Sequence, residues 1–176
     1  MKSFFKILFF LFIIKNTMAQ DITNIVNLEL KDGTVVIEMK PDDAPKHVER
    51  IKELISEKFY DGLKFHRVID GFMAQTGDPK GNGTGGSGQN IPAEFNSLPH
   101  IRGTVSMARA QDPDSADSQF FICFKESSFL NGQYTVWGQV IKGMEFVDKI
   151  KKGTGDNGVV DDPDTIISMR LAKEVN

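Results

Sequence analysis

The stretch Phe65-His66-Arg67-Val68-Ile69-Asp70-Gly71-Phe72-Met73-Ala74-Gln75-Thr76-Gly77-Asp78 places one guanidinium, several large apolar side chains and one amide close together. Its alternation predicts a strand with Phe65, Arg67 and Ile69 on one face. Asp70-Gly71 is a turn signal, so a second short strand should follow. An unpaired buried charge is costly. Arg67 therefore either reaches water from a sheet edge, with its stem packed, or has a function on that face.

Composition favours one folded domain behind a removable leader. The chain has 176 residues, of which 40% are hydrophobic and 10% aromatic, enough for a sizeable core. Lysines precede and interrupt an apolar run at 4–14, and small residues at 17–19 precede a possible cleavage point. This layout predicts a secretory signal peptide at 1–19 and a domain at 20–176. An uncleaved N-terminal anchor is the alternative, because Lys15 separates the apolar run from the cleavage point.

Charge and cysteine content exclude several classes of function. Removing 1–19 takes away three lysines and changes the formal net charge from −3 to −6. An acidic domain is a poor ligand for nucleic acid, and nothing in 20–176 predicts membrane association. Cys123 is the only cysteine, so no intrachain disulfide is possible. It lies in an apolar run and is interpreted as a small buried hydrophobe.

The rest of the chain predicts a mainly β domain. Alternation on both sides of Asp32-Gly33 predicts a hairpin. Apolar residues at helical spacing over 48–55 predict a helix that begins at Pro45, with Asp42 and Asp43 at its N-terminal end. A second helix is expected over 143–152. Further strands are expected over 103–108, 119–124, 135–140 and 166–171. Spacing alone leaves barrel and sandwich open, and a closed barrel with a helix over each open end is the economical packing.

Three other kinds of site are unsupported by context. The pattern G-x-G-x-x-G occurs at Gly81 and Gly83, but Pro92 would break the helix that a dinucleotide site requires. The three histidines are scattered, which makes a zinc site improbable. Ser106 and Ser118 lack the turn that presents a nucleophilic serine. The sequence therefore predicts no metal and no cofactor.

Four blocks in the same order as in a known family carry a resemblance. They are residues 65–78, 82–86, 103–108 and 118–123, and the likeness extends over 24–172. In these blocks the chain resembles the cyclophilin family of peptidyl-prolyl cis-trans isomerases. The resemblance implies an eight-stranded closed antiparallel β-barrel capped by two α-helices.

The resemblance also implies the site. Arg67 matches the catalytic arginine, and further residues match the proline pocket, the positions that hold the substrate backbone, and a neighbouring subsite. The proline pocket corresponds to Phe72, Met73, Phe121 and Leu130, the backbone positions to Gln75, Ala108, Arg109 and Gln119, and the subsite to Gly83. Phe129 and Tyr134 replace a tryptophan and a histidine and keep an aromatic wall, as in the bacterial secreted branch. Arg109 replaces a common asparagine, so the resemblance implies contacts between its backbone and the substrate and carries over no side-chain contact.

The expected function is isomerisation of Xaa-Pro bonds in exported proteins, acting on unfolded or proline-containing polypeptides as a monomer. Absence of a retention tetrapeptide at 172–176 and the Phe129/Tyr134 pair favour the bacterial periplasm over the endoplasmic reticulum. Weak cyclosporin binding is expected, because Phe129 lacks an indole N–H. The alternative function is a non-catalytic proline-peptide binding or chaperone module that uses the same groove.

Overall fold

A computed structural model describes residues 22–172, so the expected signal peptide at 1–19 lies outside the described residues. The chain forms one eight-stranded antiparallel sheet in the order β3-β4-β6-β5-β7-β2-β1-β8. Its strands are β1 (Ile25–Leu30), β2 (Gly33–Met39), β3 (Arg67–Ile69), β4 (Met73–Thr76), β5 (Thr104–Met107), β6 (Phe120–Cys123), β7 (Val136–Lys142) and β8 (Ser168–Leu171). The helices are α1 (Pro45–Ser56) and α2 (Met144–Val147), with 3-10 turns η1 (Ile22–Asn24), η2 (Pro113–Ser115) and η3 (Ser128–Leu130).

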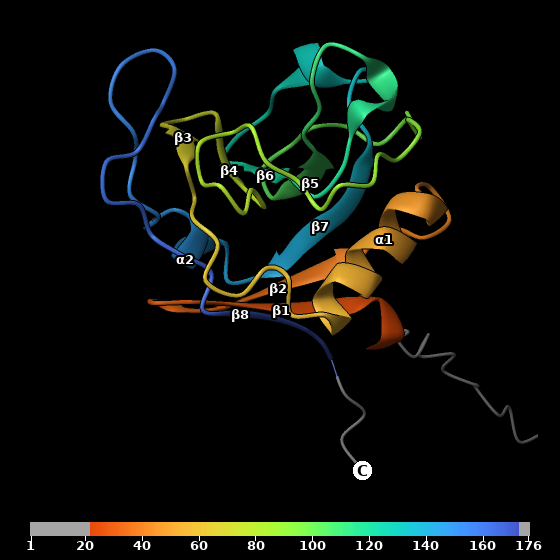
Figure 1. Cartoon of the computed structure of the whole chain (residues 1–176), viewed down its shortest axis with the longest axis horizontal. Helices are drawn as coiled ribbons and strands as arrows, with labels where there is room; N and C mark the ends of the chain where they lie inside the picture. The colour runs from red at the N-terminus through yellow and green to blue at the C-terminus, as the bar shows by residue number, and fades with distance from the viewer. Residues whose placement is uncertain (1–21, 173–176) are drawn as a thin grey trace, which may run out of the picture.

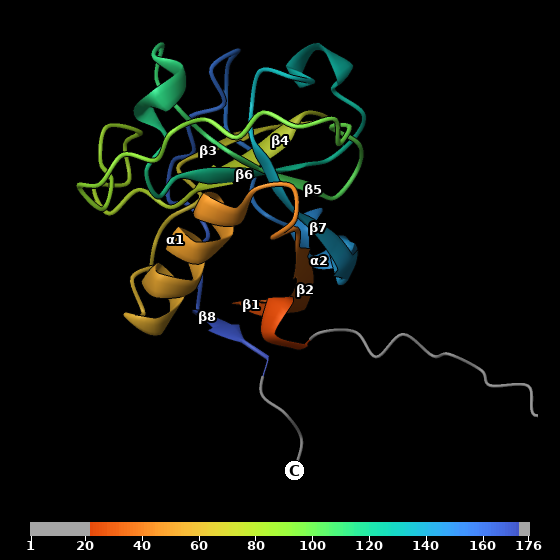
Figure 2. The same ribbon diagram turned by 90° about the vertical axis from the view of Figure 1, so that its right-hand side faces the viewer.

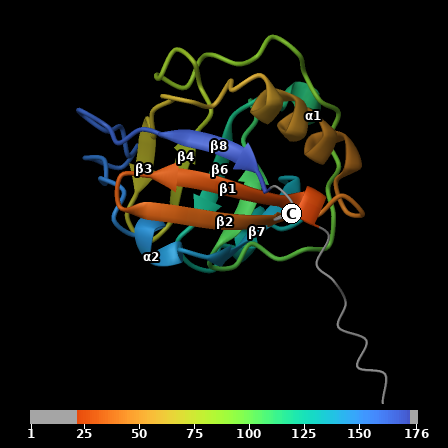
Figure 3. The same cartoon turned by 90° about the horizontal axis from the view of Figure 1, so that it is seen from below.

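The sheet folds over on itself to enclose the core. Strands β8, β1 and β2 form one layer, β3 to β6 form the other, and β7 runs between them (Figures 1 and 2). Fully buried side chains from both layers, among them Leu28, Phe120 and Trp137, fill the space between them. Helix α1 packs beside β8 and α2 beside β2, at opposite ends of the sheet (Figure 3). In the described part of the chain, no helix is both long and apolar enough to cross a membrane.

The expected closure of the barrel is wrong, because β3 and β8 remain the two edges of the sheet. The backbone beside β3 is instead bonded to the segment before β8. Phe65 donates its N–H to Asp164 O at 2.9 Å, and Val68 donates to Gly158 O at 2.7 Å. These bonds give backbone N–H groups beside the sheet edge hydrogen-bond partners without a continuous strand ladder. The result is an open half-barrel with two helices, mainly β as predicted.

Local predictions succeed where periodicity is strong. The predicted hairpin is β1–β2, with Leu30 opposite Gly33 at its turn. The predicted first helix is α1, which begins at Pro45 and buries its apolar stripe. The second helix is shorter than expected, since only Met144–Val147 is helical and the chain continues in single turns.

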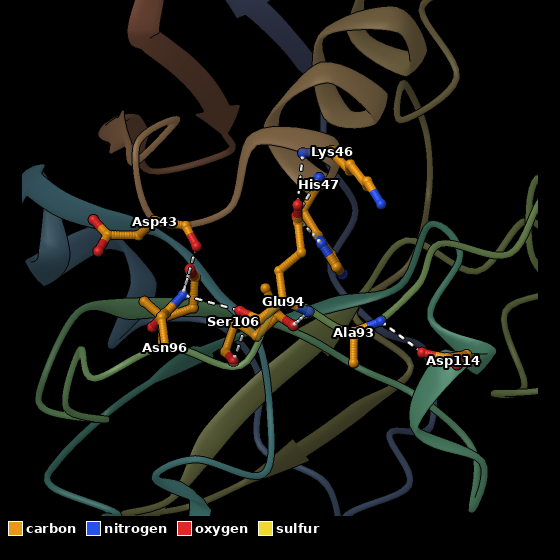
Figure 4. A network of polar contacts seen from close by, with 10 residues as sticks. Asp43, Lys46, His47, Ala93, Glu94, Asn96, Ser106 and Asp114 are labelled. Atoms are coloured by element: carbon orange, nitrogen blue, oxygen red, sulfur yellow. Dashed lines mark hydrogen bonds and ion pairs between the residues drawn. The ribbon is translucent and has the colours of Figure 1, made fainter.

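Helix α1 receives its N-terminal cap from a distant loop rather than from Asp42 or Asp43. Ala44 precedes the helix and offers no side-chain cap. The Glu94 carboxylate instead accepts the N–H groups of Lys46 (3.1 Å) and His47 (3.0 Å), and the His47 Nδ1 at 2.7 Å (Figure 4). Glu94 N–H in turn donates to the Thr135 hydroxyl beside β7 at 3.0 Å. A carboxylate at a helix N-terminus thus joins α1 to the sheet.

His47 and Glu94 make stability depend on pH in the same direction. Burial lowers the pKa of His47 below its ordinary 6.5. Burial alone would raise the pKa of Glu94, but the hydrogen bonds from His47 and Lys46 outweigh it and hold that pKa below 4.5. Both groups bind fewer protons in the folded state than in the unfolded state. Their contribution to the free energy of unfolding is therefore present at pH 7. It is lost on acidification, below pH 6.5 for His47 and below pH 4.5 for Glu94.

Substitution Glu94→Gln should lower the free energy of unfolding at pH 7 by about 1–2 kcal/mol, because the helix loses its charged cap. Urea denaturation measures this, and Glu49→Gln on the exposed face of α1 is the matched control, expected within about 0.5 kcal/mol of wild type. Equal losses in the two variants would refute the capping role.

Candidate active site

The β3–β4 hairpin presents Arg67 to a groove. Arg67 lies opposite Gln75 and Ile69 opposite Met73, whereas Val68 and Ala74 between them are fully buried in the core. The pleat therefore separates groove residues from core residues, as alternation predicts. Phe65 is an exception: it packs in the main core instead of beside Arg67, because the regular strand begins only at Arg67.

A small apolar cluster, separate from the main core, forms the floor of this groove. Met73, Phe121, Cys123 and Leu130 are buried in it. The Phe121 ring meets Tyr134 edge to face at 5.8 Å. Burial raises the pKa of the Cys123 thiol to about 12, so Cys123 remains a protonated apolar group, as predicted.

The cluster opens into a pocket of about 260 Å³. Phe129, 64% exposed, packs against Phe72 with ring centroids 5.5 Å apart and forms the outer wall. The pocket is lined by Arg67, Phe72, Met73, Gln75, Ala108, Arg109, Phe121, Phe129, Leu130 and Tyr134. A pocket of this size, lined mainly by aromatic and aliphatic side chains with Arg67 and Arg109 at its sides, suits a small ring next to a polar group.

Neutral oxygens orient the half-buried Arg67 side chain. Its Nε donates to the Asn157 carbonyl at 2.9 Å, and its Nη1 donates to Gln75 Oε1 at 3.2 Å. Within residues 22–172, no carboxylate lies within ion-pair distance of this guanidinium. Arg67 therefore keeps an uncompensated charge in a fixed orientation. The carbonyl of Asn157, 90 residues away in sequence, had no sequence signal.

A second hollow of about 300 Å³ continues the groove. Gln75, Ala108 and Arg109 line both spaces, and Gly83 and Gln119 line the second. Gln75 Nε2 donates to Gln119 Oε1 at 3.0 Å, and Gln119 Nε2 donates to the carbonyls of Gly85 (2.8 Å) and Gly83 (3.1 Å). All the site residues implied by the resemblance thus lie along one groove.

Two aspartates fix the glycine loop that forms one side of this hollow. The nearly inaccessible Asp78 accepts the N–H groups of Lys80, Asn82 and Gly83 at 2.6–3.0 Å. Burial alone would raise the pKa of Asp78, but these bonds outweigh it and lower that pKa. Asp117 accepts the N–H groups of Ser87 and Gly88 in the same way. Neither anchor had a sequence signal, because an aspartate in a polar loop is an ordinary turn residue.

A serine, a histidine and an asparagine align beneath the groove. His100 Nε2 lies 3.0 Å from Ser106 Oγ, and its Nδ1 lies 3.0 Å from Asn131 Oδ1. The order resembles a hydrolase triad. Ser106 and His100 are nevertheless fully buried, and His100 stacks under the Phe121 ring at 6.1 Å. No substrate carbonyl can reach this serine, so the arrangement supports the pocket floor and cannot perform acyl transfer.

Comparison with known proteins agrees with this geometry. The family described as cyclophilin type peptidyl-prolyl cis-trans isomerase matches residues 25–171. A probable peptidyl-prolyl cis-trans isomerase of Brucella suis is 56% identical over 171 residues, covering 90% of this chain and 87% of the relative. A peptidyl-prolyl cis-trans isomerase of Synechococcus elongatus is 48% identical over 149 residues, covering 84% and 95%.

Solved structures give the same assignment. A Cryptosporidium parvum cyclophilin-type isomerase, crystallised in the presence of the dipeptide Ala-Pro, has a TM-score of 0.78 at 28% identity, covering 85% of this chain and 99% of that one. A cyclophilin from Hirschia baltica has a TM-score of 0.77 at 29% identity, covering 86% and 74%. On sequence, fold and groove together, the chain belongs to the cyclophilin-type peptidyl-prolyl cis-trans isomerases.

Proposed function

We propose that this isomerase accelerates rotation about Xaa-Pro bonds in exported polypeptides that have not finished folding, and that Arg67 is its catalytic residue. The observation that carries the proposal is the uncompensated Arg67 guanidinium, which lines a 260 Å³ pocket with an apolar floor and is oriented by Gln75 and Asn157.

The chemistry needs a donor and a grip on the proline ring, and no cofactor. Amide resonance gives the bond a barrier of about 18–20 kcal/mol. As the amide twists, the prolyl nitrogen regains its lone pair and can accept a hydrogen bond. An arginine fork beside it can donate to that nitrogen in the transition state only, which lowers the barrier. A ten-thousand-fold acceleration needs about 5.5 kcal/mol of such preference.

The groove supplies a place for each part of the substrate. The proline ring would enter the pocket floored by Met73, Phe121 and Leu130, and the polypeptide backbone would lie against Gln75 and Gln119. Residues before proline would extend toward the hollow beside Gly83. The Cryptosporidium isomerase, crystallised in the presence of Ala-Pro, supports a proline-containing ligand here.

The signal peptide expected at 1–19 supports a cell compartment for this isomerase. The apolar run and small residues within 1–19 support export, and the Phe129/Tyr134 pair supports the bacterial periplasm as destination. A monomeric enzyme that meets newly exported chains there, without nucleic acid or membrane contact after cleavage, is the simplest form of this proposal. Detection of the mature N-terminus at Gln20 in a periplasmic fraction would support it.

Substitution Arg67→Ala should reduce kcat/KM on an Xaa-Pro peptide by about a hundredfold, the usual effect of removing one oriented transition-state donor. A protease-coupled assay on the mature protein measures it. Arg170→Ala, on β8 and paired with Asp61, is the matched control, and its rate should stay within about twofold of wild type.

The same samples separate an enzyme from a binding module. Titration of the peptide by NMR should give binding to both wild type and Arg67→Ala, with rate enhancement only in wild type. If wild type bound the peptide without accelerating isomerisation, the groove would be a non-catalytic chaperone site.

Cyclosporin should bind weakly, because the side chain of Phe129, at the exposed wall of the pocket, has no indole N–H to donate. Substitution Phe129→Trp should strengthen binding by about three- to tenfold, the equivalent of one neutral hydrogen bond. Calorimetric titration measures the dissociation constant. Ile167→Trp adds an indole at an exposed residue outside the groove and should leave the dissociation constant unchanged. If the two substitutions changed affinity equally, the hydrogen-bond explanation would fail.

A further inference from the structure

Arg109 is the charged residue shared by the pocket and the second hollow of the groove. It follows β5, is half-buried, and lines both the 260 Å³ pocket and the 300 Å³ hollow. The family resemblance gave its side chain no role, since only its backbone was expected to contact substrate. The contacts of its guanidinium supply one.

Carbonyl groups of two separate loops hold the Arg109 side chain. Its Nε and Nη2 donate to the Gln133 carbonyl at 3.2 and 3.0 Å. Its Nη1 donates to the carbonyls of Ala110 (2.9 Å) and Gln111 (3.2 Å). All three nitrogens are therefore bonded to protein carbonyls. The side chain fastens the loop after β5 to the turn that leads into β7.

The same guanidinium lies over the aromatic wall of the pocket. It is 4.7 Å from the centre of the Tyr134 ring, which lines the pocket, and 5.8 Å from that of Phe95, which does not. Tyr134 in turn meets Phe121 edge to face. A cation over a ring face is attracted by it, so Arg109, Tyr134 and Phe121 form a continuous row of contacts that ends at the pocket floor.

The turn that Arg109 holds also carries the rest of the outer wall. Gln133 Nε2 donates to the Phe129 carbonyl at 2.9 Å, which closes the turn containing η3. Leu130, part of the pocket floor, lies in that turn. Arg109 is thus one of the contacts that hold this turn, and Tyr134 is the pocket residue over which its guanidinium lies.

Among residues 22–172, no acidic side chain forms an ion pair with this cation. The nearby carboxylates have other donors: Asp114 accepts Ala93 N–H, Asp117 accepts Ser87 N–H, and Glu94 caps α1. In the part of the chain that the structure describes, none lies within ion-pair distance of Arg109. Its contacts are directed to the wall of the pocket.

We infer that Arg109 is a positioning residue, which holds Tyr134 and its turn against the proline ring and acts on binding rather than on bond rotation. The inference rests on the isomerase site proposed above. A wall that contacts the ring equally in the ground state and in the twisted state changes KM and leaves kcat alone.

The test is a double-mutant cycle between Arg109→Gln and Tyr134→Leu, with kcat and KM measured on an Xaa-Pro peptide. Arg109→Gln should raise KM about three- to tenfold and leave kcat within about twofold. In the Tyr134→Leu background it should add little, because the residue through which it acts is gone. Arg102→Gln, an arginine paired with Asp148 outside the groove, is the matched control and should leave both constants unchanged.

A spectroscopic measurement keeps the inference testable if turnover is lost. The chain has two tyrosines, and Tyr60 is fully buried with its hydroxyl bonded to Ser118 O at 3.1 Å. In protein labelled with 3-fluorotyrosine, the fluorine signal of Tyr134 should shift in Arg109→Gln, and shift less in Arg109→Lys, while that of Tyr60 stays in place as evidence of folding. Tyr134→Phe assigns the signals.

Three outcomes would overturn the inference: a fall in kcat at unchanged KM, full additivity in the cycle, or an unmoved Tyr134 signal. Failure of this inference and failure of the proposed function give different results. If the proposed function is wrong, Arg67→Ala leaves the isomerisation rate unchanged, whatever effect Arg109→Gln has on the fluorine signal of Tyr134.

Discussion

A guanidinium oriented by neutral oxygens, with no carboxylate of residues 22–172 within ion-pair distance, is the interaction on which the site depends. Two requirements normally conflict. A cation needs partners that hold it in place, but an anionic partner would neutralise the positive charge that stabilises the twisted amide. Arg67 meets both, since Gln75 Oε1 and the Asn157 carbonyl orient it without neutralising it. The charge thus remains available to a nitrogen that becomes basic only while the peptide bond is twisted.

The fold brings the two holders together from distant parts of the chain. Gln75 comes from the strand paired with β3, and Asn157 comes from the loop that covers the open edge of the sheet. Leaving the barrel open is therefore part of the site, because the same edge bonds that replace a strand ladder bring this loop beside Arg67. Gln119 extends the arrangement to the glycine loop, which carboxylates anchor from behind.

Local pattern predicted the β1–β2 hairpin, α1 and the shared face of Arg67 and Ile69, because alternation and helical spacing record which side of an element is buried. Resemblance supplied the remaining groove residues. Neither could predict the Asn157 carbonyl, since every residue type carries one. The sequence also did not predict that Glu94 caps α1 or that Arg109 bonds to the carbonyls around it. The sequence pattern around a charged loop residue does not indicate which distant backbone group it binds. The predicted closure of the barrel was wrong because the loop segment before β8, rather than a strand, bonds to the edge at β3.

The most direct test gives Arg67 the carboxylate it lacks. Substitution Gln75→Glu keeps the shape of the side chain, and NMR exchange spectroscopy on an Xaa-Pro peptide then measures isomerisation and affinity together. Gln119→Ala is the control, because it removes the same Gln75–Gln119 bond without neutralising the arginine. The account predicts a rate about tenfold or more below that of the control in Gln75→Glu, with the peptide still bound. An undiminished rate would contradict it.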